Sequence, residues 1–238
     1  MSRPPLLILR PAPGDAATAA LAGADGWGVL SAPLFDIAPL GWDAPDVSAF
    51  DALLLTSANA VRHGGAALAR YRALPVHAVG AATAEAAQAA GFAVASVGSG
   101  GAAAAHDAAR AAGHARLLRL AGRDHVPLPD GVLTRIVYGA RPRPLALDAI
   151  ELLRDGPAIV LLHSAAAARA FVREVEQHTL PRARIGLAAL APAIADAAGD
   201  GWCARATASR PCDAALLSAA ARLATQMTGT ASRGGGQE

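Results

Sequence analysis

The chain has 238 residues, of which 53% are hydrophobic, and a formal net charge of +2; all 21 of its basic residues are arginine. No basic run stands out and aromatic residues make up only 4%, which argues against nucleic-acid binding. No apolar run approaches the ~20 residues of a membrane-spanning helix, and Leu6–Leu9 is too short for a signal peptide. Two cysteines without a CxxC spacing fit a reducing compartment, so we expect a cytoplasmic protein that does not associate with membranes.

Short apolar runs alternate with alanine-rich runs, in the pattern of strands that lead into helices. In chain order, we expect strands at Leu6–Arg10, Phe50–Thr56, Val76–Val79, Phe92–Val97, Leu117–Leu120, Ala158–Leu162, Ile185–Ala189 and Trp202–Thr207. The helices expected between and after them are Asp15–Ala22, Ala58–Tyr71, Thr83–Ala90, Ala102–Ala112, Ala165–Gln177, Ala193–Ala198 and Asp213–Gln226. This alternation favours an α/β fold with parallel sheets covered on both faces.

An internal repeat indicates two similar lobes. Leu53–Ala58 aligns with Val160–Ala165, and Val79–Ala87 aligns with Ala189–Ala197 at a nearly constant offset. In each copy the strand, the small or hydroxyl residue and the helix keep their order. We therefore predict two parallel-sheet α/β lobes of the same plan.

Two proline-containing segments, Val29–Leu40 and Thr134–Leu145, fit neither lobe and are expected to be extended, because proline disfavours helix at the residue before it. If the chain leaves one lobe along the first segment and returns along the second, the two form a two-stranded connector and the second lobe is an insertion. We expect a first lobe of residues 1–37 and 140–238, a second of residues 38–139, and disorder in the glycine-rich tail, residues 228–238.

The recurring feature of the chain is a strand that runs into a small or hydroxyl residue and then a helix, at residues 56–59, 80–83, 163–165 and 190–192. Ligands bind at the carboxyl ends of parallel strands, and amides at helix starts attract anions. Several such turns favour a polyanionic ligand. In the alternative interpretation Ser57 and Ser164 only cap their helices. The seven histidines show no metal-ligand spacing.

These segments resemble the uroporphyrinogen-III synthase family over about residues 5–225. The family's T-S-x-N-A-V pattern matches Thr56–Val61, and its V-G-x-x-T-A pattern with a later glycine matches Val79–Gly91. Its L-x-x-x-G and V-Y-x-x-x-P patterns match Leu118–Gly122 and Val137–Pro142.

The chain departs from that family pattern in three places. Ala191 stands where the family usually has a hydroxyl residue or glycine, and His163 precedes Ser164 where an apolar or small residue is more usual. Residues Arg123–Val132 leave room only for a turn, where the family usually has a full helix.

The resemblance implies two α/β lobes with the active site in the cleft between them. It implies a lyase of tetrapyrrole and haem biosynthesis that cyclises hydroxymethylbilane, with inversion of the last pyrrole ring and loss of water. Positioning and electrostatic stabilisation suffice for that reaction, so no cofactor and no metal are expected. We also expect a monomer that makes transient contact with the enzyme supplying its substrate. The alternative is a non-catalytic tetrapyrrole-binding or sensor protein of the same fold.

The strand-end turns and the resemblance together give the expected site residues. Tyr138 matches the family's crossing tyrosine and is expected to donate a proton to the departing hydroxyl; alternatively its ring only packs in the connector. Substrate carboxylates are expected at the strand-end turns, namely Thr56, Ser57, Asn59, Gly80, Ala81, Ala82, Thr83, Ser164, Ala191 and Ala193. Arg10, Arg119 and Arg141 are expected to be exposed and to attract the substrate over longer distances.

Overall fold

The computed structural model describes residues 3–128 and 131–231, and the chain forms two compact units. Unit 1 consists of Met1–Asp36 and Pro142–Glu238, and unit 2 is Ile37–Arg141. The chain therefore passes from unit 1 into unit 2 and back again. No helix in the described part of the chain is long and apolar enough to cross a membrane.

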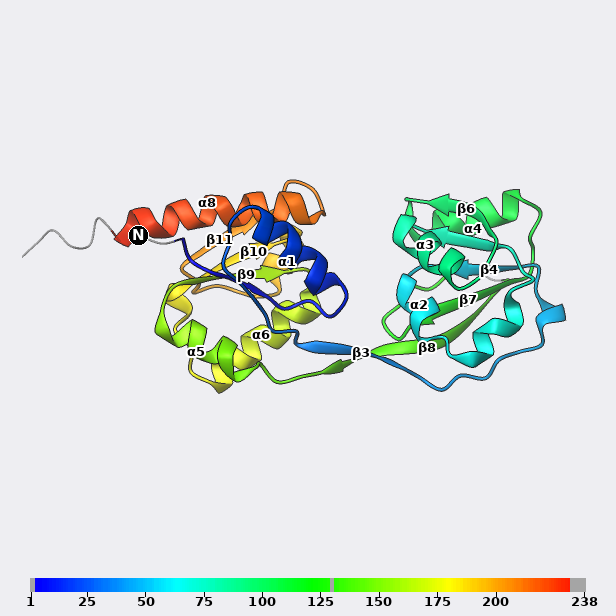
Figure 1. The fold of residues 1–238 in the computed structure, drawn as a ribbon, viewed down its shortest axis with the longest axis horizontal. Helices are drawn as coiled ribbons and strands as arrows, with labels where there is room; N and C mark the ends of the chain where they lie inside the picture. The colour runs from blue at the N-terminus through cyan, green and yellow to red at the C-terminus, as the bar shows by residue number, and fades with distance from the viewer. Residues whose placement is uncertain (1–2, 129–130, 232–238) are drawn as a thin grey trace, which may run out of the picture. The chain divides into compact units, whose positions relative to one another are not determined.

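Unit 1 is a parallel sheet with helices on both faces (Figure 1). Its strands, in spatial order, are β11 (Ala204–Thr207), β10 (Ile185–Ala189), β9 (Ala158–Leu162), β1 (Leu6–Ile8) and β2 (Val29–Ser31). Its helices are α1 (Gly14–Ala24), α5 (Leu147–Asp155), α6 (Ala165–Gln177), η3 (Arg182–Arg184), α7 (Pro192–Asp196) and α8 (Asp213–Ala231). Alternate strand residues point to opposite faces, so each face builds its own core. Leu7, Leu9 and Val160 pack against α5, α6 and α7, whereas Ile8 and Leu161 pack against α1 and α8.

Unit 2 repeats this plan. Its strands, in spatial order, are β3 (Phe35–Pro39), β8 (Val132–Pro142), β7 (Leu117–Gly122), β4 (Ala52–Leu55), β5 (Val76–Val79) and β6 (Val94–Gly98). Its helices are η1 (Val47–Ala49), α2 (Ala58–His63), η2 (Ala66–Tyr71), α3 (Ala81–Ala89) and α4 (Gly101–Ala111). In spatial order β8-β7-β4-β5-β6 corresponds to β2-β1-β9-β10-β11 in unit 1, and the internal repeat matches β4 and β5 with β9 and β10. The predicted α/β class with two similar parallel-sheet lobes is confirmed.

The two faces of the unit 2 sheet are unequally packed. One face holds the large apolar core, in which Leu53, Leu118 and Leu120 meet α2, η2 and α3. On the α4 face the apolar cluster of the described residues is smaller and consists of Ala52, Ala109 and Leu117. Arg119, two residues from Leu117 along β7, therefore points to this weakly apolar face.

β3 and β8 are neighbours in the second sheet, and each runs across a boundary between the units. Within unit 2 the N–H of Leu40 donates to the carbonyl of Val137 at 2.9 Å, and within unit 1 the N–H of Arg143 donates to that of Leu34 at 2.8 Å. The predicted two-stranded connector is therefore formed by β3 and β8.

Several expected element bounds were wrong. One helix was expected over Ala58–Tyr71. Helix α2 instead ends at His63, because Gly64 and Gly65 interrupt it, and the following residues form the separate 3-10 helix η2. Val29–Ser31, expected to belong to the first extended crossing, is the edge strand β2. Helix α5 was not expected. Residues 228–231 of the expected disordered tail belong to α8, and residues 232–238 lie outside the described residues.

Candidate functional site

A pocket of about 410 Å³ lies in unit 2, at the carboxyl ends of β4, β5 and β7. Four of the residues predicted for substrate or catalysis line it: Thr56, Ser57, Arg119 and Tyr138. The loop after β7 forms another wall through residues 123–126, and the first residues of α4 contribute Gly101 and Ala102. The strand-end position and the mixture of hydroxyl and cationic groups suit an anionic ligand.

Tyr138 lies on β8 with its ring half-buried against Gly122. A Cβ atom at Gly122 would lie 2.6 Å from the Tyr138 ring, so only glycine leaves room for the ring in this position. The ring of His63 lies nearby, with the ring centroids 6.1 Å apart. The Tyr138 hydroxyl makes no hydrogen bond to any residue that the structure describes. It is therefore an unengaged donor beside the pocket.

Arg119 is not the exposed arginine that was predicted, because only 2% of the residue is accessible. Its Nη1 donates to the carbonyl of Val126 at 2.6 Å, and its buried Nε has no hydrogen-bond acceptor among the described residues. Within that part of the chain no carboxylate forms an ion pair with it. Burial lowers the pKa of Arg119, with the neighbouring Tyr138 acting in the opposite direction. A guanidinium nonetheless stays charged, so the pocket wall contains an unneutralised cation.

The turn at Ser57 is a helix cap. The Oγ atom of Ser57 accepts the N–H of Asn59 at 3.2 Å, and the Oδ1 atom of Asn59 accepts from Nη1 of Arg62 at 3.2 Å. This geometry agrees with the alternative interpretation of Ser57, although its side chain also faces the pocket. Helix α2 spans only Ala58–His63, so its dipole adds little to anion binding.

The turn at Gly80 leaves two backbone amides free. Gly80 adopts φ 80°, a left-handed conformation that favours glycine, and its own N–H donates to the carbonyl of Gly98 at 2.7 Å. The N–H of Thr83 donates to the Gly80 carbonyl at 3.2 Å, and the residue is buried. Of the predicted residues here, Ala81 and Ala82 are thus the ones whose amides have no acceptor in the described chain.

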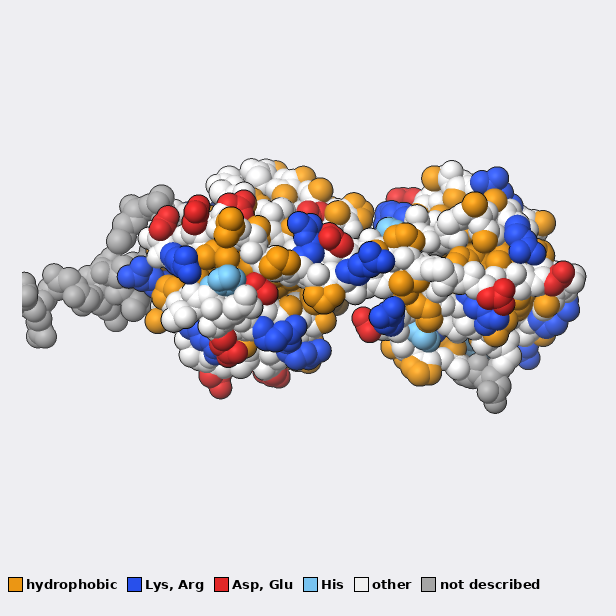
Figure 2. Space-filling model, turned by 90° about the horizontal axis from the view of Figure 1, so that it is seen from below, with side chains coloured by type: hydrophobic (Ala, Val, Ile, Leu, Met, Phe, Trp, Pro, Cys, Tyr) orange, Lys and Arg blue, Asp and Glu red, His pale blue; other side chains and the backbone are white. Residues whose placement is uncertain are grey.

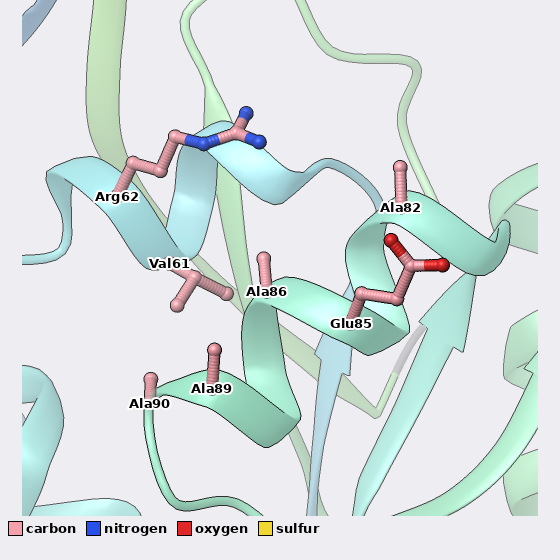
Figure 3. A pocket seen from close by; sticks show the side chains of 7 residues that line it. All are labelled: Val61, Arg62, Ala82, Glu85, Ala86, Ala89 and Ala90. Carbon is pink, nitrogen blue, oxygen red and sulfur yellow. The ribbon is translucent and has the colours of Figure 1, made fainter.

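Ala82 faces a second hollow in unit 2, a groove of about 560 Å³ between α2 and α3. Four of its seven lining residues are alanine, and Arg62 extends from α2 and Glu85 from α3 (Figure 3). The two charged groups are of opposite sign, so the groove has no preference for an anion. The structure therefore does not bring Ala82 together with Tyr138 and Arg119 in one pocket.

In unit 1, Ser164 caps α6, its Oγ atom accepting the N–H of Ala167 at 3.1 Å. Ala191 precedes α7 without a side-chain cap, and Pro192 has no N–H. Since the N–H of Ile194 donates to the Ala191 carbonyl at 3.0 Å, the free amide within the first turn of α7 is that of Ala193. The helix start after Ala191 therefore has fewer free backbone amides for binding an anion than the helix start after Ser164.

Arg10 belongs to a polar network that was not predicted. Its Nη1 lies 3.1 Å from Oδ2 of Asp213, which also accepts from the Thr18 hydroxyl at 3.0 Å. Oδ1 of Asp213 lies 3.0 Å from Nε2 of His163. Burial, and next the charge of Arg10, lower the pKa of His163, although Asp213 opposes this shift. Arg10 is therefore neutralised within unit 1 and is a poor candidate for long-range attraction.

Arg141 is the exposed member of the predicted arginines, near the end of β8, and forms no ion pair with a described residue. Arginine and acidic side chains are interspersed on the face seen in Figure 2, without a patch of one sign. Within the described residues, no three His, Cys, Asp or Glu side chains are grouped so that they could hold a metal ion.

The model of the uroporphyrinogen-III synthase HemD family matches residues 16–218. The fold is similar to the crystal structure of uroporphyrinogen-III synthetase from Helicobacter pylori 26695, with a TM-score of 0.63 and 16% identity over 92% of this chain and 99% of that chain. A uroporphyrinogen III synthase structure from the extremely thermophilic bacterium Thermus thermophilus is matched with a TM-score of 0.40 and 18% identity, over 95% of this chain and 99% of that chain.

No curated protein sequence matches the chain significantly. The family match nevertheless covers most of the chain, from α1 into α8. The Helicobacter pylori likeness shows a shared α/β fold. The chain therefore belongs to the uroporphyrinogen-III synthase family, the lyases of tetrapyrrole biosynthesis that cyclise hydroxymethylbilane.

Proposed function

We propose that this chain converts hydroxymethylbilane to uroporphyrinogen III, closing the ring with inversion of the last pyrrole and releasing one water molecule. The observation that carries the proposal is the family match over residues 16–218. The unit 2 pocket supports it, because a free phenol and an unneutralised cation line the same space. Both suit a substrate with carboxylates on every ring and a hydroxyl to be lost.

In the proposed reaction the Tyr138 hydroxyl donates its proton to the departing hydroxyl of the substrate. The carbon–oxygen bond breaks, water leaves and the adjoining pyrrole stabilises the cation. The substituted carbon of the last ring attacks, giving a spiro intermediate that opens and recloses with that ring inverted. The proton lost on reclosing restores the phenol, so the enzyme ends the cycle unchanged.

Carboxylate binding is proposed at the turns of both units. In unit 2 the free amides of Ala81 and Ala82 and the hydroxyls of Thr56 and Ser57 support it. In unit 1 the amides at the start of α6, after Ser164, and the amide of Ala193 are the proposed counterparts. The exposed guanidinium of Arg141 is proposed to act on substrate capture. We further propose a cytoplasmic monomer that meets the enzyme producing its substrate only transiently.

The test is isomer analysis after the protein is supplied with enzymatically generated hydroxymethylbilane. The free substrate cyclises unaided to the non-inverted isomer I, so enrichment of isomer III above the no-protein control is the expected result. Only isomer I from the wild-type protein would contradict catalysis. Binding of the tetrapyrrole in that case would identify a non-catalytic binding protein.

A further inference from the structure

Arg119 occupies a strand position that is apolar in the other unit. In unit 1, Ile8 of β1 pairs with Leu161 of β9. In unit 2, Arg119 of β7 pairs with Leu54 of β4. Leu54 and Leu161 are equivalent in the internal repeat, and β7 has the place of β1 in the strand order. A fully buried isoleucine in one unit thus corresponds to a buried cation in the other.

The helix that covers Ile8 has no counterpart over Arg119. After β1, helix α1 packs on the sheet, with Ala22 in the same apolar cluster as Ile8. After β7, the described residues 123–128 and 131 contain no helix. The pocket of about 410 Å³ lies in this region, bounded by the loop after β7, the start of α4 and the Tyr138 side of β8.

The guanidinium of Arg119 is incompletely satisfied. Nη1 donates to the Val126 carbonyl, while Nε and Nη2 have no acceptor among the described residues. Nε and Nη2 together form the edge of a guanidinium that holds a carboxylate through two hydrogen bonds. The other charged groups at the pocket are exposed Arg123 and Asp124, and the Nδ1 atom of His125 lies 3.0 Å from the Gly122 carbonyl. Asp124 forms no ion pair with Arg119 in the described chain.

A buried cation without a counterion is costly, and an incoming anion removes that cost. We infer that this pocket is the subsite for one carboxylate-bearing arm of the tetrapyrrole, with the Arg119 guanidinium as its anchor. Arg119 then acts by direct contact in a largely dehydrated site, whereas an exposed arginine would act by salt-screened attraction. The inference rests on the proposed function, since the arm is that of its substrate.

Arg119→Met tests the inference, with Arg123→Met as the matched control on the same pocket wall. Charged hydrogen bonds of this kind correspond to roughly a 10- to 100-fold change in affinity. We expect Arg119→Met to raise KM by that factor, with kcat much less affected, and Arg123→Met to change KM by less than about threefold because Arg123 is exposed. Raised salt should weaken the effect of Arg123 and leave that of Arg119.

Direct binding separates this inference from the proposed function. Quenching of porphyrin fluorescence measures the affinity of each variant for uroporphyrin, which has acetate and propionate arms, and for coproporphyrin, which keeps only propionates. Weaker binding of both by Arg119→Met assigns the subsite to a propionate, and weaker binding of uroporphyrin alone assigns it to an acetate. Either result supports the subsite even where the wild-type protein forms only isomer I.

Unchanged KM and unchanged binding of both porphyrins by a folded Arg119→Met variant would overturn the inference while leaving the proposed function intact. If Arg119→Met fails to fold, Arg119→Lys is tested instead, because lysine keeps the positive charge and cannot make the bidentate hydrogen bonds to a carboxylate. Arg119→Lys is expected to weaken binding several-fold, and wild-type affinity in that variant would equally exclude the anchor role.

Discussion

Units 1 and 2 share a strand order, yet they differ in whether the arginine at the matching strand, β1 or β7, is paired with a carboxylate. Arg10, just after β1, is held by Asp213 from the start of α8, 3.1 Å away. Arg119, within β7, has a single carbonyl acceptor and no carboxylate in the described chain. Unit 1 thus pairs its arginine with a carboxylate of its own, whereas in the described part of unit 2 Arg119 has none. The difference teaches that two copies of one fold can place an arginine at the equivalent strand and differ in whether the fold itself neutralises it.

Tyr138→Phe gives the largest expected effect and should alter the rate without altering the stability of unit 2. A positioned proton donor is worth ~10²–10⁴-fold, and water can replace part of this, so we expect isomer III to form about 100-fold more slowly. The unfolding free energy should stay within about 0.5 kcal/mol of wild type, since the hydroxyl has no hydrogen-bond partner in the described chain. The assay is coupled synthesis with chromatographic separation of isomers.

Tyr71→Phe is the matched control in the same unit. Its hydroxyl donates to the Pro45 carbonyl at 2.6 Å, and the residue is fully buried. Losing that bond should destabilise unit 2 by about 1 kcal/mol while the rate of the folded enzyme is unchanged. A wild-type rate for Tyr138→Phe would remove Tyr138 from the mechanism.

Asp213→Asn tests the same comparison in unit 1, because it leaves Arg10 without its counterion. Asp213 accepts hydrogen bonds from Arg10 and Thr18 and meets His163, so we expect unit 1 to lose about 2 kcal/mol. Urea unfolding followed by Trp27 and Trp202 fluorescence reports on unit 1, and Trp42 reports on unit 2. Asp36→Asn is the control, because its ion pair with Arg143 is exposed on both sides and should contribute little. Equal effects of the two substitutions would show that the Asp213 network is not stabilising.

Acidification should weaken both units, through His163 in unit 1 and through His77 and His63 in unit 2, because burial lowers the pKa of each of these histidines. In unit 2 the pKa of His77 is lowered mainly by burial and to a smaller extent by His114. In unit 1 the pKa of His163 is lowered mainly by burial and to a smaller extent by the charge of Arg10. The unfolded chain keeps histidine pKa values of about 6.5, so below that pH it binds protons that the folded units do not. Stability therefore falls as pH falls, by at most about 1.4 kcal/mol per pH unit for each histidine.

Urea unfolding at about pH 7.5 and about pH 5 measures this dependence. His77→Gln should reduce it for unit 2 alone, because His77 contacts Ser96 and His114 within that unit, and His63 accounts for the remainder. Stability that does not change across this pH range would mean that none of these histidines is kept neutral by the fold.

The smallest effects are expected from the two strand-end serines. Ser57→Ala and Ser164→Ala each remove one N-cap hydrogen bond and should cost about 1 kcal/mol. Ser218→Ala is the control, since its hydroxyl bonds only to a carbonyl within α8. Substrate titration of the folded variants adds the second readout. A rise in KM for Ser57→Ala or Ser164→Ala beyond the small loss of stability would show that the serine also contacts substrate.

The α/β fold could be predicted because its strands and turns follow from local sequence patterns. Apolar runs such as Ala158–Leu162 became strands, and the repeat identified the equivalent turns. Helix α5 was missed although its buried Ala149, Ile150 and Leu153 form a helical stripe, because prolines crowd the preceding segment. The Arg10–Asp213 pair could not be predicted, since 203 residues separate the partners. The burial of Arg119 did have a signal, namely a charged residue within the apolar run Leu117–Leu120.

The insertion of unit 2 also sets the order in which the protein can form during synthesis. β1 and β2 emerge from the ribosome early, but their sheet needs β9, which begins only at Ala158. Unit 2 is one continuous stretch, Ile37–Arg141, and is complete before then. At ~5–20 residues per second the apolar segment Leu6–Leu9 waits on the order of ten seconds for its partner. We therefore expect nascent unit 1 to need chaperones more than unit 2, which can fold as it is made.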